Sequence, residues 1–133
     1  MMVLGHEAAG IVAECGPGVA AIAPGDHVIF WFRQHCGCCR HRSTGQTVLC
    51  IGRNDSPRWP MHDGTVRVQL NGGPANQMAR IGAFSEEVVC PAEQVVKIRS
   101  DLPFTPAAII GCSVATGIGA VIRQPGFRPG RAC

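Results

Sequence analysis

The sequence predicts a mainly β fold with a helical segment at its C-terminal end. Glycine and proline are frequent, with 17 and 10 among 133 residues, and short apolar stretches alternate with turn residues. An apolar stretch without charged residues follows at 102–122. The length is typical of a chain that buries a real core. We therefore expect a β domain over 1–100 and a helical segment over 101–133.

The turns of the β domain are marked by glycine. Gly-Pro-Gly stands at 16–18 and Asn-Gly-Gly at 71–73, and Pro24-Gly25 suits a type II turn because glycine accepts a positive φ. Strands are expected at 8–15, 26–32, 65–70, 83–90 and 95–98. The polar, proline-containing stretch 51–64 is expected to be a loop.

The stretch 102–122 is expected to be a helix that is buried in protein. Thr105 is a suitable N-cap and Pro106 a suitable first helical residue. A break is expected near Gly111 and Cys112, after which the helix resumes as far as Arg123. Prolines and glycines make the stretch too weakly apolar for a membrane span.

Charge and the N-terminus exclude several classes of protein. The net charge is +3 and the basic residues are scattered, so nucleic acid is not an expected partner. The first residues, MMVLGHE, lack the basic and apolar regions of a secretory signal, which predicts a cytoplasmic location. In that compartment, cysteines are more often metal ligands or free thiols than disulfides.

Cysteines crowd into one segment, the cysteine lobe (residues 36–50). Cys36, Cys39 and Cys50 follow the spacing C-x2-C-x10-C, in which one tight turn supplies two ligands to a tetrahedral zinc ion. His35, Cys38 and His41 stand close by in the sequence. The alternative is a set of free thiols without metal, since zinc takes four ligands and only three are well placed.

A second candidate set joins His6 and Glu7 to Cys112, which is far away in the sequence. Histidine, carboxylate and cysteine are all zinc ligands. By spacing alone this set is weak, because a lone buried cysteine is usually a small core residue.

Several ordered motifs, taken together, resemble the zinc-dependent medium-chain alcohol dehydrogenase family. They are GHEAAGIVAECGPGV from residue 5, APGDHVIF from residue 23, the cysteine lobe, GAFSEEVVCPAEQVVKI from residue 82 and IIGCSVATGIGAV from residue 109. The motifs run from one end of the chain to the other. Their order and intervals make the resemblance far more specific than any single motif.

The resemblance implies a GroES-like partial barrel, which in this family leads to a Rossmann domain that binds NAD(P). It implies that His6 and Cys112 are catalytic zinc ligands with Glu7 beside them, and that Thr116 faces the nicotinamide. It also implies a structural zinc ion in the cysteine lobe. The expected reaction is oxidation of a small alcohol to an aldehyde or ketone.

The sequence departs from this family in three ways. A further cysteine ligand normally precedes the GHE motif, and only four residues precede Gly5 here. Arg42 occupies the third cysteine position of the lobe, and a guanidinium cannot ligate zinc. The Gly117-x-Gly119 pair lies within the apolar stretch and lacks the third glycine of a dinucleotide fingerprint.

We therefore expect a portion of the catalytic domain, truncated at both ends and inactive alone. Two alternatives remain open. One is a small zinc-binding module without catalysis. The other is a structural GroES-like domain that associates, as a homo-oligomer, through exposed strand edges.

Overall fold

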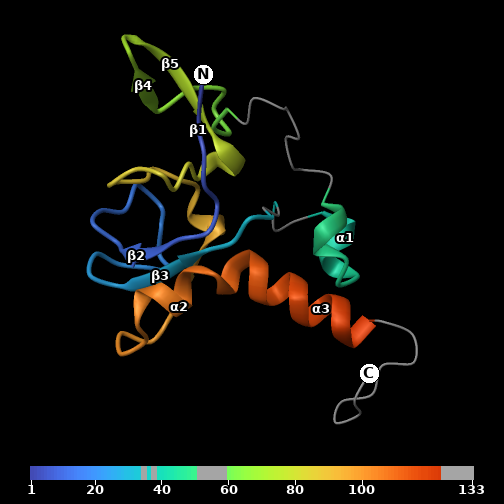
Figure 1. Ribbon diagram of the computed structural model, residues 1–133. Helices are drawn as coiled ribbons and strands as arrows, with labels where there is room; N and C mark the ends of the chain where they lie inside the picture. Colours follow the sequence, from blue (N-terminus) through green and yellow to red (C-terminus); the bar gives the residue numbers. More distant parts are fainter. Residues whose placement is uncertain (34–35, 37–38, 51–59, 124–133) are drawn as a thin grey trace.

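The structure is a computed structural model that describes residues 1–33, 36, 39–50 and 60–123 (Figure 1). Its strands are β1 (Met2–Val3), β2 (Ala9–Ile11), β3 (His27–Phe30), β4 (Val68–Leu70), β5 (Gly73–Gln77) and β6 (Val95–Lys97). Its helices are α1 (Arg40–Ser43), α2 (Phe104–Ala108) and α3 (Ala115–Arg123), with a π-helical segment at Ile110–Val114 between the last two. The predicted mainly β fold with a C-terminal helical segment is confirmed.

The first sheet has the order β1-β5-β4. Strand β1 pairs in parallel with β5, and β4 pairs with β5 as an antiparallel hairpin. Asn71 and Gly72 form the hairpin loop with φ of 53° and 77°. Positive φ at both loop residues is the type I′ geometry, whose twist matches that of the flanking strands. The predicted turn at 71–73 is thus confirmed, with Gly73 already in β5.

The second sheet is antiparallel, with the order β2-β3-β6. In its register Ile29 pairs with Ala9 on one side and with Val96 on the other. The central strand β3 is buried on both faces, which explains its continuous apolar run Val28, Ile29 and Phe30. Figure 1 shows α2 lying beside β2 and β3.

The core gathers around Phe30, Ala79 and Ile81, between the end of β3 and the turn after β5. Gln94 is fully buried there, and its amide donates to the carbonyl oxygens of Ala79 at 2.9 Å and of Trp31 at 3.3 Å. These bonds join two segments that belong to no common sheet, and one of them satisfies the buried carbonyl of Ala79. Gln94 therefore fixes the turn after β5 against the end of β3.

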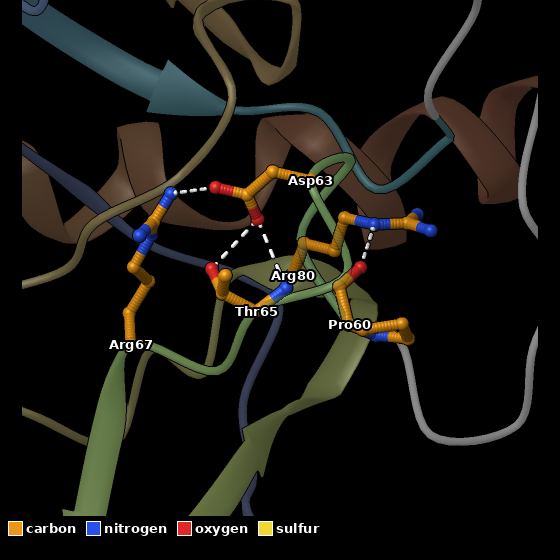
Figure 2. Close-up of polar contacts among 5 residues, drawn as sticks. All are labelled: Pro60, Asp63, Thr65, Arg67 and Arg80. Atoms are coloured by element: carbon orange, nitrogen blue, oxygen red, sulfur yellow. Dashed lines mark hydrogen bonds and ion pairs between the residues drawn. The ribbon is translucent and has the colours of Figure 1, made fainter.

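The segment that leads into β4 is held by polar contacts (Figure 2). The carboxylate of Asp63 accepts bonds from the backbone N–H and the hydroxyl of Thr65, at 2.9 and 2.6 Å, and pairs with Arg67. Arg80 is buried, and its Nε–H donates to the Pro60 carbonyl at 2.6 Å. Arg80 thereby joins this segment to the turn after β5.

The predicted strand at 83–90 is wrong, because this segment forms bends instead. The hydroxyl of Ser85 lies 2.8 Å from the Gly82 carbonyl and 2.9 Å from the Glu87 carbonyl. Such local side-chain bonds compete with a strand ladder. Of the other predicted strands, those near 8–15, 26–32, 65–70 and 95–98 are present but shorter, as β2, β3, β4 and β6. Residues 51–59 of the predicted loop lie outside the described residues.

The helical segment also differs from the prediction at two points. Helix α2 begins at Phe104, with Pro103 rather than Thr105 as its N-cap. Pro106 is tolerated in the first turn because N–H groups there have no helical acceptor. The predicted break at Gly111 and Cys112 is confirmed as the π-helical segment.

The expectation that the whole 102–122 segment is buried is wrong for α3. Ala107 and Gly111 are buried, whereas α3 contains no buried residue and exposes Ile118 and Ile122. The reason is that α3 continues directly from the π-helical segment and extends away from both sheets, as Figure 1 shows. Within the described part of the chain, no helix is both long and apolar enough to cross a membrane.

An ion pair between Asp26 and Lys97 ties the start of β3 to β6. Lys97 Nζ lies 2.6 Å from Asp26 Oδ1, and the Ala23 N–H donates to Oδ2 at 2.9 Å. Lys97, and then the Ala23 N–H, hold the pKa of Asp26 below its ordinary value. A lowered folded-state pKa stabilises the fold above the unfolded-state pKa of about 3.9. That contribution is lost as the pH falls through the folded-state pKa.

We expect Asp26→Asn to lower the free energy of unfolding near pH 7 and to have a smaller effect below about pH 4. Urea unfolding of both proteins at about pH 7 and about pH 3 measures the two differences. Asp101→Asn is the control, since the Arg99–Asp101 pair is largely exposed and is expected to contribute little at either pH. An Asp26→Asn effect that does not change with pH would contradict the prediction.

Candidate functional site

The GHE motif lies in the segment between β1 and β2. Gly5 has a φ of +94°, and a Cβ at this position would lie 2.9 Å from the ring of Phe84. The Gly5 carbonyl accepts the Ala83 N–H at 2.9 Å. The His6 ring stacks at a tilt on Phe32, with 4.8 Å between the ring centroids. The backbone bond at Gly5 and the ring of Phe32 therefore fix the orientation of the His6 side chain.

Glu7 reaches across to the π-helical segment. Its Oε1 accepts the backbone N–H of Ser113 at 2.7 Å, a bond that joins residues 106 positions apart. Hydrogen bonds from Ser113, and then the nearby His6, lower the pKa of the Glu7 carboxyl below its ordinary value. Cys112, the residue before Ser113, is half-buried.

Gly111 fixes the same segment from its other side. A Cβ on Gly111 would lie 1.9 Å from the Phe30 carbonyl oxygen, so the segment passes directly over the end of β3. Phe32, which stacks on His6, lies two residues after Phe30. The structure thus brings the backbone around Cys112 and the segment of His6 and Glu7 to the same end of β3. Thr116 is exposed, one turn further along in α3.

Cys36, Cys39 and Cys50 converge in the cysteine lobe. Their sulfur atoms all lie within 4.8 Å of one another, and Cys50 is buried. The Cys36 N–H donates to Cys50 Sγ at 3.2 Å. Zinc–sulfur bonds of about 2.3 Å place the sulfurs of a tetrahedral site about 3.8 Å apart, so a small contraction fits these thiols to zinc. Within the described ranges this is the one group of three or more such side chains that converges, and His6, Glu7 and Cys112 form no comparable group.

The third cysteine position of the lobe lies on α1. Arg42 is exposed there, on the helix that begins after Cys39. His41 is half-buried on the same helix, but its ring nitrogens are not part of the convergent group. His35 and Cys38, which the sequence also offers as ligands, lie outside the described residues.

A cleft of about 620 Å³ opens along β2 and the 83–90 segment. Its lining residues do not include His6, Glu7 or Cys112. Cys90 lines it, and burial, followed by the charge of Glu93, raises the pKa of this thiol to about 11. A thiol that stays protonated is a poor nucleophile and a poor metal ligand. We therefore assign no chemistry to this cleft.

Sequence reasoning missed three residues that shape the site: Phe32, Gly111 and Ser113. The packing of Gly111 had one signal, because a glycine next to a candidate ligand in an apolar helix indicates close backbone approach. Nothing in the pattern indicated Ser113, whose hydroxyl and backbone N–H both act on the Glu7 carboxylate.

Several known proteins with similar sequences are dehydrogenases. The alcohol dehydrogenase GroES-like domain family matches residues 1–100. Alcohol dehydrogenase B of Mycobacterium tuberculosis is 42% identical over 127 residues, which cover 95% of this chain and 34% of that protein. S-(hydroxymethyl)glutathione dehydrogenase of Escherichia coli is 39% identical over 130 residues, covering 97% of this chain and 35% of that protein.

A solved structure gives the same result for the fold. The structure of an alcohol dehydrogenase zinc-binding domain protein from Burkholderia ambifaria superimposes with a TM-score of 0.75 at 30% identity. The match covers 92% of this chain and 34% of that one. The chain thus spans about a third of the length of the relatives it matches. The match over residues 1–100 and the agreement in fold show that this chain belongs to the alcohol dehydrogenase GroES-like domain family.

Proposed function

We propose that this chain is a zinc-binding portion of the catalytic domain of an alcohol dehydrogenase. The observation that carries the proposal is the bond from Ser113 N–H to Glu7, which brings the segments of His6 and Cys112 together. In this proposal His6 and Cys112 are ligands of the catalytic zinc, and Glu7 stands beside them. Cys36, Cys39 and Cys50 hold a structural zinc.

The residues of this chain position, but do not complete, the catalytic site. Zinc bound there would supply Lewis acidity, which lowers the pKa of an alcohol substrate. His6 is oriented by Phe32, and Thr116 stands one turn beyond Cys112, where the resemblance places the nicotinamide of NAD(P). Two or three ligands from this chain leave the zinc weakly held. The substrate class is a small alcohol or the corresponding aldehyde.

We expect the purified chain to bind two equivalents of Co²⁺ with different affinity. The tighter one belongs to the cysteine lobe and the weaker one to His6 and Cys112. Cys112→Ser and His6→Asn should each abolish only the weaker step, which titration followed by thiolate-to-cobalt absorption measures. With NAD and primary alcohols, the chain alone should show no turnover.

A single equivalent that is indifferent to both substitutions would overturn the catalytic assignment. It would support the second candidate, a zinc module without catalysis, which the convergence of the three lobe thiols favours. Full dehydrogenase activity of the purified chain would contradict the proposal that its residues do not complete the catalytic site. If the chain instead binds no metal and its association state rises with concentration, it is a structural domain that pairs through strand edges.

A further inference from the structure

The π-helical segment contains a shift in its backbone hydrogen bonds at the residue after Cys112. The Val114 N–H donates to the Ile109 carbonyl, five residues earlier, at 3.0 Å. In an α-helix that carbonyl would accept the N–H of Ser113, four residues later. The shift by one residue therefore removes the helical acceptor that Ser113 would otherwise use. Such π-bulges occur frequently at functional sites.

The carboxylate of Glu7 takes the place of this acceptor. Its Oε1 lies 2.7 Å from the Ser113 nitrogen, the short distance of a bond to an ionised acceptor. The bond joins the two residues that directly follow the proposed ligands, since Glu7 follows His6 and Ser113 follows Cys112. On the other side of Cys112, Gly111 is pressed against the Phe30 carbonyl. Cys112 thus lies between two neighbours that are both fixed in place.

We propose that Glu7 is a positioning residue, which holds Cys112 in register with His6 by accepting the N–H that the π-bulge releases. The proposal rests on the proposed function for the identity of the metal ligands, but the bond itself is independent of it. A role as hydrogen-bond acceptor differs from a role as metal ligand in one testable way. Glutamine keeps the acceptor oxygen and loses the charge, whereas alanine loses both.

The first experiment follows hydrogen exchange of the Ser113 amide by NMR in the metal-free chain. Glu7→Ala should accelerate this exchange about tenfold or more, and Glu7→Gln should change it less than about threefold. Glu86→Ala is the matched control, an exposed glutamate on another segment, and should leave the rate unchanged. Exchange in Glu7→Ala within about twofold of the unmodified chain would overturn the proposal. So would a Glu7→Gln rate equal to that of Glu7→Ala.

The second experiment measures Co²⁺ affinity from the absorption that depends on Cys112, taken as the difference between each protein and its Cys112→Ser counterpart. Glu7→Ala should weaken this affinity about tenfold, the usual effect of losing a residue that orients a ligand, and Glu7→Gln should retain most of it. Equal affinity in all three proteins would overturn the positioning role. If no absorption depends on Cys112, the proposed function fails, while the exchange rates still decide whether Glu7 holds the segment.

Discussion

Replacing Gly111 by alanine is expected to lower the free energy of unfolding by about 3 kcal/mol or more. The added methyl group would lie 1.9 Å from the Phe30 carbonyl oxygen and 3.1 Å from its carbon. Both atoms belong to the backbone of the central strand β3, so no side-chain rotation relieves the clash. Either the π-helical segment or the end of β3 must move.

Gly117→Ala provides a matched control in α3. A Cβ at Gly117 meets no atom within 4 Å, and the residue is exposed. Because alanine has the higher helix propensity, this substitution should stabilise the chain by about 0.5–1 kcal/mol. The two glycines stand six residues apart in the same helical segment. A loss of stability in Gly111→Ala together with a gain in Gly117→Ala would therefore separate the effect of close packing from that of helix propensity. Urea or thermal unfolding measures both free energies, and a Gly111→Ala cost below about 1 kcal/mol would contradict close packing of Gly111 on Phe30.

The Gly111 substitution also tests how the site depends on the fold. The backbone contact at Gly111 and the Glu7 bond at Ser113 together place Cys112 at the end of β3. A chain that tolerates the alanine by shifting the segment should weaken the Ser113–Glu7 bond as well. The Ser113 amide should then exchange faster even under conditions where the protein remains folded.

The elements that the sequence predicted correctly are those in which local and tertiary preferences agree. Strand β3 is a run of large apolar residues and lies buried at the centre of its sheet. Strand β5 was missed because its residues, GPANQ, have low strand propensity, and it forms through the hairpin at Asn71-Gly72 and the pairing with β1. The opposite occurs in the segment 83–90. Its apolar pattern predicts a strand, but the local hydrogen bonds of Ser85 favour bends instead.

The sequence predicts candidate ligands but not the contacts that hold their segments in place. His6, Glu7, Cys112 and the lobe cysteines are predicted by chemistry and by resemblance of motifs, and among the described residues only Cys36, Cys39 and Cys50 converge as one group. The bond between Glu7 and Ser113 depends on a one-residue shift in a helix, which no side-chain pattern encodes. The position of α3 was mistaken because its apolar residues predict a covered face, whereas among the described elements none covers Ile118 and Ile122.

Replacing Cys50 by serine is expected to abolish zinc binding by the cysteine lobe. Cys50 is the buried member of the three converging thiols, and its sulfur already accepts the Cys36 N–H at 3.2 Å. A serine hydroxyl is a poor zinc ligand and its shorter bonds do not reach the same point. Losing one of few ligands should raise the dissociation constant on the order of 100-fold or more. Gel filtration removes the weakly held zinc of His6 and Cys112, so zinc per chain measured afterwards by mass spectrometry should fall from about one to near zero.

Cys15→Ser is the control for this substitution, since Cys15 is a half-buried thiol outside the lobe that donates to the Ile22 carbonyl at 3.6 Å. Serine can make the same bond, so zinc content should not change. A Cys50→Ser chain that keeps its zinc would show that the metal sits elsewhere.

Because Cys50 is buried, its substitution is a more decisive test than a substitution of Cys36, which is exposed. A thiolate carries its charge at little cost on the surface, but in the interior the charge must be balanced by metal or by hydrogen bonds. If the lobe holds no zinc, replacing Cys50 by serine costs only the burial of a hydroxyl, about 1–3 kcal/mol with or without a chelator. If the lobe holds zinc, adding a chelator should destabilise the unmodified chain and leave the Cys50→Ser chain unaffected. The chelator response therefore separates a metal centre from a cluster of free thiols.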